Sequence, residues 1–281
     1  MPVVFVLIWS TGFIVARYGM PLAPPMTFLM VRFLLSIVCF LPWIWLANVQ
    51  WPSGAEQWRH LAVTGVLMQA CYLGGVWCAI KLGMGSGLSS LIVGLQPVLT
   101  AFWLAGAGIA VTRRQWLGLL LGLVGLFMVV SRKFGMGGEA TWTNLGSVLI
   151  ALAGITVGTL YQKRFVAPCD VRTASVVQLG AAFLVSLPLA LLESESMQWN
   201  AQLVGAMAWS VLALTLGGSS LLFMLIQRGA AASVTSLLYL VPPVTAMLAW
   251  LLFDEAITVM TMAGTVVTAI GVGLVVSEPK K

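Results

Sequence analysis

The sequence predicts an all-α membrane protein whose ten transmembrane helices form two inverted five-helix repeats, and three observations support this fold class. Of the 281 residues, 60% are hydrophobic and only 8% are charged, whereas a soluble domain carries about 25% charged residues. The apolar runs are too long and too continuous for barrel strands, which need only about 9–11 alternating residues. The chain also matches itself, without a gap, at an offset of 146 residues.

This internal repeat divides the chain into two copies. At that offset Gly12 aligns with Gly158, and Pro97 aligns with Pro243. We predict one integral membrane unit, with a first repeat over 1–131, a linker loop over 132–142 and a second repeat over 143–281. A duplicated membrane domain in one chain is a common architecture of transporters.

Prolines, glycines and charges mark the ends of ten predicted helices, at 3–19, 24–47, 59–81, 86–110, 114–131, 143–164, 172–192, 203–226, 231–252 and 258–277. Several of them approach the roughly 20 residues that a helix needs to span a bilayer. Because each copy contains five helices, an odd number, the second copy must enter the membrane from the opposite side. The repeats are therefore inverted about a pseudo-two-fold axis in the membrane plane.

The positive charges support this topology. With the N-terminus inside, nine of the fourteen Lys and Arg residues lie in cytoplasmic segments, four lie on the other side, and Arg32 lies within a helix. The positive-inside rule then places both termini in the cytoplasm. The basic residues are scattered over short loops, so the net charge of +6 reflects membrane topology and predicts no nucleic-acid partner.

The sequence lacks the motifs of enzymes and of ATP-driven pumps. It contains no GxxxxGK[ST] phosphate cradle and no HExxH, and no two carboxylates lie at membrane depth. The four cysteines match neither a metal site nor a disulfide framework, and we expect the single histidine, His60, to be an interfacial residue. We therefore predict no enzyme activity, no bound metal or cofactor, and no use of ATP.

Polar residues in otherwise apolar helices mark a candidate substrate cavity, because such side chains avoid lipid and face other helices or an internal space. In chain order they are Ser10 in the first helix, Gln69 and Tyr72 in the third, Ser89, Gln96, Thr100 and Trp103 along one stripe of the fourth, Thr215 and Ser219 in the eighth, and Tyr239 in the ninth. A Ser or Thr often bonds to its own helix backbone instead. The two amides need several partners each, so they favour a wet cavity more strongly.

Arg32 is the one charge well inside a predicted helix. A membrane-embedded arginine is costly and is a functional hypothesis by default. Two roles are open for it: it snorkels or bonds the carbonyls of a neighbouring helix, or it meets a carboxylate of the substrate. Its repeat mate is Gln178, so only one copy carries the charge.

Helix-breaking residues occupy matching places in the two copies. Pro97 and Pro243 are predicted to lie in the middle of the fourth and ninth helices, where a proline bends a helix. Small residues precede both helices, and they include Gly83, Gly85 and Gly229. We predict that these positions act as hinges for gating, although prolines and small residues are also ordinary in packed membrane helices.

Several residues together resemble a known family. They are Trp9-Ser10, Arg32 within FLMVRFLLS, Gln96-Pro97, Pro242-Pro243 and the ending FDEAITVMTMAGTVVTAIGVGLVV, which contains Glu255, Gly264 and Gly271. In this order and spacing, over essentially the whole chain, they are similar to the drug/metabolite transporter superfamily in its EamA-type ten-helix form. Ile109 stands at the counterpart of Glu255 in the first copy, so only one copy can use this glutamate, whether for structure or for substrate.

The resemblance implies an exporter of amino acids or other metabolites in the bacterial inner membrane, with a central cavity between helices 1–4 and 6–9. Exporters of aromatic amino acids are one class that it implies. We predict a monomeric secondary transporter that works by alternating access, with the small-molecule solute near the midplane. The alternative is a membrane protein that does not transport in this way, such as a channel or a packing scaffold.

Overall fold

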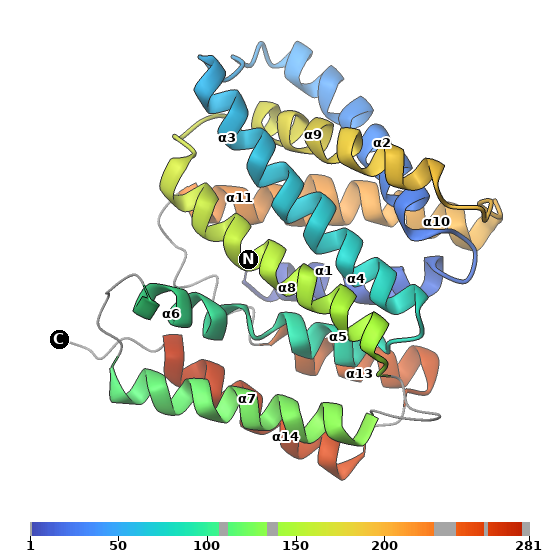
Figure 1. Cartoon of the computed structure of the whole chain (residues 1–281). Helices are drawn as coiled ribbons and strands as arrows, with labels where there is room; N and C mark the ends of the chain where they lie inside the picture. The colour runs from blue at the N-terminus through green and yellow to red at the C-terminus, as the bar shows by residue number, and fades with distance from the viewer. Residues whose placement is uncertain (1, 107–111, 134–139, 228–239, 256–257, 277–281) are drawn as a thin grey trace.

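The computed structural model describes residues 2–106, 112–133, 140–227, 240–255 and 258–276, which are mostly helical (Figure 1). The first half contains α1 (Pro2–Gly19), α2 (Pro25–Leu46), α3 (Ala55–Gly65), η1 (Val66–Cys71), α4 (Tyr72–Lys81), α5 (Ser86–Val93), α6 (Gln96–Gly106) and α7 (Arg113–Lys133). The second half contains α8 (Trp142–Phe165), α9 (Val171–Leu191), α10 (Ala201–Trp209), η2 (Ser210–Ser219), α11 (Ser220–Gln227), α13 (Val241–Phe253) and α14 (Val259–Val276).

These segments confirm the predicted fold class. Within the described residues they form ten helical stretches, in the predicted order, when α3–η1–α4, α5–α6 and α10–η2–α11 are each counted as one stretch. Seven stretches are long and apolar enough to cross a membrane, and the remaining three are shorter apolar helices. At a rise of 1.5 Å per residue, a helix of about 20 residues matches the bilayer's hydrocarbon core of about 30 Å.

The third and eighth stretches each contain a π-helical segment at the same place in the repeat. The segment η1 interrupts the third stretch, and η2 covers the residues that lie 146 positions further along the chain. π-Helical turns are rare and frequently lie at functional sites. Their occurrence in both halves marks the centre of these two stretches as a candidate functional region.

The prolines break the fourth and ninth stretches differently from the prediction. The prediction that Pro97 lies in the middle of a continuous helix is wrong, because α5 ends at Val93, a turn follows, and Pro97 is the second residue of α6. Pro243 is likewise the third residue of α13. A proline is tolerated in the first turn because the N–H that it lacks has no helical partner there.

The packing of the helices follows the two-fold relation between the halves. α2 packs against its repeat mate α9, and α7 packs against its repeat mate α14 along the lower edge of Figure 1. α3 packs against α8, and the equivalent pair from the other copy, α10 and α1, packs as well. The interface between the halves therefore runs through the middle of the bundle.

The contact between α7 and α14 depends on glycines. A Cβ added at Gly125 would lie 2.6 Å from the carbonyl oxygen of Gly264, and one added at Gly271 would lie 2.4 Å from the backbone nitrogen of Gly122. Small residues of this kind let the backbones of membrane helices approach each other closely. These two helices form a tightly packed pair beside the central helices.

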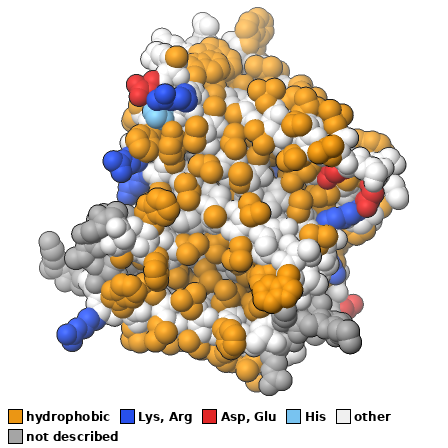
Figure 2. All heavy atoms as spheres, in the orientation of Figure 1, with side chains coloured by type: hydrophobic (Ala, Val, Ile, Leu, Met, Phe, Trp, Pro, Cys, Tyr) orange, Lys and Arg blue, Asp and Glu red, His pale blue; other side chains and the backbone are white. Residues whose placement is uncertain are grey.

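The surface of the bundle is apolar around its middle and charged at its two ends (Figure 2). Large side chains on the outer faces are exposed, among them Leu120, Phe127, Ile150 and Leu184. We call the end that carries Arg59, Arg113, Arg114, Lys163, Arg164 and Arg172 the basic end, and the end that carries Glu193, Glu195, Asp254 and Glu255 the acidic end. This distribution fits a protein whose middle is surrounded by lipid.

Candidate functional site

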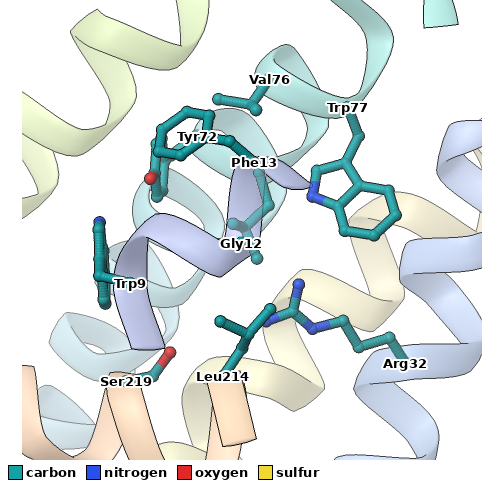
Figure 3. A pocket seen from close by; sticks show the side chains of 10 residues that line it. Trp9, Gly12, Phe13, Arg32, Tyr72, Val76, Trp77, Leu214 and Ser219 are labelled. Atoms are coloured by element: carbon teal, nitrogen blue, oxygen red, sulfur yellow. The ribbon is translucent and has the colours of Figure 1, made fainter. Parts of the chain in front are cut away.

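Two small compartments lie next to each other at the interface between the halves, and they share Trp9, Tyr72, Leu73 and Ser219. The first, which we call the arginine compartment, has a volume of about 40 Å³. Its lining side chains come from α1, α2, α4 and η2 (Figure 3), and they are Trp9, Gly12, Phe13, Arg32, Tyr72, Leu73, Val76, Trp77, Leu214 and Ser219.

The second compartment, which we call the amide compartment, has a volume of about 30 Å³. Its lining residues are Trp9, Met68, Gln69, Tyr72, Leu73, Ile155, Gln162, Gln178, Ser219, Leu222 and Phe223. A single water needs about 10–15 Å³ of such volume. Each compartment therefore holds only a few waters in this conformation, and a larger solute requires the halves to move apart.

The repeat relates the two compartments to each other. The offset of 146 residues carries Arg32 onto Gln178 and Trp77 onto Phe223, from the first compartment to the second. Leu73, which lines both compartments, falls on Ser219, which also lines both. The pair therefore forms one two-fold-related site in which the chemistry of the two sides differs.

Arg32 brings a buried charge to this site. Its side chain is only 2% exposed, and its Nε donates a hydrogen bond of 3.1 Å to the hydroxyl of Thr215 in η2. The Thr215 hydroxyl in turn donates to the carbonyl of Ser210, at 3.0 Å. Among the described residues no carboxylate lies within ion-pairing distance of Arg32. A buried cation without a protein counter-ion is suited to bind an anionic group.

Aromatic rings form the walls around this charge. Trp9 and Tyr72 stack with 6.5 Å between ring centroids and an angle of 7° between the ring planes. Trp77 stacks on Phe28 at 4.4 Å and is only 1% exposed. In Figure 3 the Arg32 guanidinium reaches from α2 into the compartment, beside Leu214 and on the side of Trp77. The compartment therefore combines one cation with flat apolar surfaces.

At the acidic end, two glutamates of the second half bind helix N-termini of the first half. Glu193 accepts hydrogen bonds from the backbone N–H groups of Met26 and Thr27, at 2.9 and 2.8 Å. Glu255 accepts from the N–H and the hydroxyl of Ser86, at 3.0 and 2.8 Å. Free N–H groups and the helix dipole make a helix N-terminus a favourable place for a carboxylate. We call these two contacts the carboxylate clamps.

A larger cavity lies at the same end. It has a volume of about 560 Å³, and its lining includes Arg17, Tyr18, Ile80, Lys81 and Phe253. Arg17 and Ile80 lie one helical turn beyond Phe13 and Trp77 of the arginine compartment. Lys81 pairs with Glu195 and donates to the carbonyl of Met20. This cavity forms a cationic vestibule beyond the arginine compartment.

The basic end is closed by aromatic and polar contacts between the halves. His60 of α3 lies 2.8 Å from the hydroxyl of Tyr161 and stacks on Phe165, both of which are in α8. The position of His60 at this end agrees with the interfacial role expected of it.

In the loop before α9, at the same end, the hydrogen bond from Arg172 lowers the pKa of Asp170 below its ordinary value of 3.8.

The comparison with known proteins decides the family. The sequence pattern of the EamA-like transporter family matches residues 2–131 and again residues 144–277. The chain belongs to this family. An EamA-like transporter is a multi-pass membrane protein and is not an enzyme, as the sequence predicted. Within the described residues no group of three or more His, Cys, Asp or Glu is placed to hold a metal ion.

Several proteins resemble this EamA-like transporter in sequence or in fold. The uncharacterized inner membrane transporter YedA of Escherichia coli K12 is 26% identical over 86% of this chain and 78% of its own length. A probable amino-acid metabolite efflux pump of Salmonella typhimurium is 25% identical over 95% of this chain and 90% of its own length. A solved crystal structure matches with a TM-score of 0.67 at 17% identity, over 97% of this chain and 94% of that one, which is a likeness of fold.

The structure brings only some of the predicted cavity residues together. Gln69, Tyr72 and Ser219 line the compartments. Thr215 lines neither of them, but its hydroxyl accepts the hydrogen bond from Arg32. Ser10 is fully buried but directs its hydroxyl toward the carbonyl of Val241, at 3.5 Å. Ser10 therefore lies at the contact of α1 with α13 and lines neither compartment.

The predicted stripe on the fourth helix is not brought to the site. The stripe assumed one continuous helix, and the turn between α5 and α6 changes its direction. Trp103 is 60% exposed on the outside of the bundle, and Thr100 bonds to the carbonyl of Gln96. Gln96 donates to Thr159 in α8, at 3.1 Å, and Ser89 is buried away from both compartments.

The remaining predicted positions have other placements. Gly83 has a φ of +94°, a conformation that suits glycine, in the turn between α4 and α5, and Gly85 precedes the first residue of α5. Tyr239 and Gly229 lie outside the described residues. Glu255, for which a structural or a substrate role was open, lies in its carboxylate clamp at the start of α5.

Sequence reasoning did not identify Gln162, the two π-helical segments or the carboxylate of Glu193 as parts of the site. The repeat offset contained a signal for one further member, because Gln178 is the repeat mate of Arg32. Gln162 has Ala16 as its mate, so the repeat gave no signal for it. The contact of Glu193 with α2 joins residues 166 and 167 positions apart, which local patterns do not reveal.

Proposed function

We propose that this EamA-like transporter exports a small carboxylate-bearing metabolite of the amino-acid class across the bacterial inner membrane by alternating access. Arg32 carries the proposal, because it is a buried cation, without a carboxylate partner among the described residues, in a compartment between two inverted halves. Membrane transporters bind their solutes at such repeat interfaces near the bilayer midplane. The names of the relatives, an inner membrane transporter and probable amino-acid metabolite efflux pumps, support the same solute class and location.

The chemistry of the path favours an anion. A solute that leaves the arginine compartment toward the acidic end enters the vestibule lined by Arg17 and Lys81. Cations along a narrow path raise the local concentration of an anionic solute. The stacked rings of Trp9 and Tyr72 offer a flat surface to its apolar part, so aromatic amino acids belong to the panel of candidate solutes.

In this conformation the carboxylate clamps hold the acidic end closed. We infer that export requires the clamps of Glu193 and Glu255 to open while the contacts at the basic end stay closed. The turn before Pro97 and the first turn of α13 around Pro243 are the proposed hinges. A Pro97→Ala, Pro243→Ala double variant is expected to keep its fold and transport more slowly. An unchanged flux would rule out the hinges.

We propose that the basic end faces the cytoplasm, with both termini on that side. Cys169, in the loop between α8 and α9, provides the test once the other three cysteines are replaced by serine. A membrane-impermeant maleimide is expected to label it in inverted vesicles and not in right-side-out vesicles. The reverse pattern would contradict the orientation.

The transport experiment is uptake of labelled amino acids and metabolites into proteoliposomes that contain the purified protein. We expect saturable flux for at least one carboxylate-bearing solute, and we expect Arg32→Gln, which copies the repeat mate, to raise its KM strongly while leaving a measurable flux. Because no carboxylate lines the described compartments, we expect flow down the solute gradient without proton coupling. Flux that does not saturate would favour a channel, and no flux for any solute would favour a scaffold.

A further inference from the structure

Two residues that line the amide compartment carry buried hydrogen-bond donors that no described residue accepts from. Gln162 and Gln178 are 3% and 5% exposed, and the Nε2 atom of each lacks a hydrogen-bond partner among the described residues. Both residues line the same compartment, although they come from different helices, α8 and α9. The other buried side-chain atoms without a partner in the described part of the chain are single hydroxyls, and none of their residues lines either compartment.

Leaving such groups unpaired is costly. A buried polar group without a partner destabilises a protein by about 1–3 kcal/mol, and most buried polar atoms are therefore bonded. An amide nitrogen offers two N–H donors and no acceptor. Two residues with such donors that line one space offer a site for an oxygen that accepts hydrogen bonds, such as that of a carbonyl, a carboxamide or a carboxylate.

Close backbone packing fixes the position of Gln178. A Cβ added at Gly65 would lie 2.2 Å from the carbonyl oxygen of Gln178, so α3 and α9 are in direct backbone contact at this point. Gln69 follows one turn later in η1 and is 8% exposed in the same compartment. The amides thus stand on a rigid part of the interface, which is what a selective binding site requires.

The repeat shows that this arrangement is not a copy of the arginine compartment. Arg32 and Thr215 of one side correspond to Gln178 and Gln69 of the other. Gln162 corresponds to Ala16, so the amide side has gained a polar group that the arginine side lacks. One side therefore offers a cation, and the other offers neutral donors.

We propose that the amide compartment is a second polar subsite, which binds an uncharged or anionic acceptor group at the far end of a solute whose carboxylate is bound by Arg32. This inference rests on the proposed function and narrows its solute class. The two compartments share Trp9 and Tyr72, so one solute can extend from the first into the second when the halves separate. Preferred solutes then carry two polar ends, as amino acids with an amide or acid side chain do.

Glutamine and methionine provide a matched pair of probes. Both have the same backbone carboxylate and side chains of similar length, and only glutamine carries an acceptor oxygen at its end. In proteoliposomes with the wild-type protein, we expect glutamine to inhibit transport of a labelled panel solute with an inhibition constant about tenfold lower than that of methionine. The reason is that methionine offers no oxygen to the amide N–H donors of the compartment. Equal inhibition by both would overturn the subsite.

Leucine variants of the two amides test whether the preference for glutamine arises in the amide compartment. Gln178→Leu and Gln162→Leu keep the side-chain size and remove the donors, and each is expected to weaken inhibition by glutamine about tenfold while methionine changes by less than about twofold. Gln198→Leu is the control, because Gln198 is exposed at the acidic end and only its backbone N–H is bonded, to Leu22. Variants that leave glutamine inhibition unchanged would show that the amides bind water only and would overturn the proposal.

The outcomes separate the subsite from the proposed function. If no solute of the panel shows saturable flux, the transport function itself fails. If flux is saturable but glutamine and methionine inhibit it alike, only the subsite fails. The wild-type comparison needs no variant, so the proposal stays testable even if a leucine variant does not fold.

Discussion

Glu255 in the second half accepts hydrogen bonds from both the backbone N–H and the hydroxyl of Ser86, at the start of α5 in the first half. The second carboxylate oxygen accepts from the N–H of Gly87, at 3.3 Å. One side chain thus satisfies two N–H groups that α5 cannot pair internally. This contact joins the two repeats at a position where the first repeat has no equivalent acid.

Replacing this glutamate tests how much the clamp contributes to stability. We expect Glu255→Ala to lower the free energy of unfolding by about 1 kcal/mol, because α5 loses its cap and the favourable interaction with its dipole. Glu255→Gln, which keeps one acceptor oxygen, is expected to lose less. Thermal unfolding in detergent measures both variants.

The control for this change is Glu56→Ala at the basic end. Glu56 lies 3.6 Å from Arg59, but both side chains are largely exposed, and such pairs contribute little. We expect the unfolding temperature of the Glu56→Ala variant to stay at the wild-type value. An equal loss in both variants would mean that the Glu255 contact has no special role.

The second clamp predicts the accessibility of the acidic end. Glu193→Ala removes the acceptor for Met26 and Thr27, so we expect the acidic end to open more often. In a protein that keeps only Cys78 of its four cysteines, a maleimide is expected to label this half-buried residue of α4 several-fold faster. Cys71, the last residue of η1 and two turns deeper in the bundle, serves as the reference site in a parallel single-cysteine protein.

An unchanged rate at Cys78 would contradict the gating role of Glu193. An equal increase at both cysteines would indicate general loosening of the bundle instead of opening at one end.

The hydrogen bond from Arg32 to Thr215 predicts a coupled effect on transport. Thr215→Val keeps the shape of the side chain and removes the acceptor for Arg32 Nε. We expect the KM for a carboxylate solute to rise about tenfold, because the guanidinium is no longer held in position, an effect of about 1.4 kcal/mol. In an Arg32→Gln background the same change is expected to have no further effect, and additive losses would contradict the coupling.

The close contact of α7 and α14 predicts a contrast between two glycines of one helix. Gly271→Ala would place a Cβ 2.4 Å from the nitrogen of Gly122, whereas a Cβ at Gly273 would meet nothing within 4 Å. We expect Gly271→Ala to cost about 1–3 kcal/mol. Gly273→Ala is expected to be neutral or slightly stabilising, because alanine favours helix over glycine. Unfolding curves that agree for the two variants would contradict the packing argument.

The loop before α9 predicts a dependence on pH. Asp170 accepts from the N–H and the guanidinium of Arg172, and its pKa is lowered below 3.8. A carboxyl whose pKa is lower in the folded state stabilises the protein above its unfolded pKa, and this stabilisation is lost as the pH falls through the folded pKa. Asp170→Asn is therefore expected to be less stable than wild type at pH 7, and the difference should shrink toward pH 3. A constant difference over that range would rule out this linkage.

The sequence predicted the ten helices because their signal is local. Runs of apolar residues, with prolines and charges between them, mark helix ends such as Pro25 and Lys81 without reference to the rest of the chain. The site was predicted less completely. Gln69, Tyr72 and Ser219 line the compartments, as does Arg32, whereas Trp103 was expected in the cavity and lies outside, because its stripe depended on a helix that is broken before Pro97.

By itself, the sequence determined the membrane class, the number of helices, the duplication and the inversion that follows from five helices per copy. These properties depend on hydropathy and on counting, which need no knowledge of contacts. Only the tertiary structure decided that Glu193 and Glu255 clamp the other half, that Thr215 holds Arg32, and which amides share one compartment. Each of these contacts joins residues distant in sequence, and their formation depends on how helix faces pack rather than on the local chain.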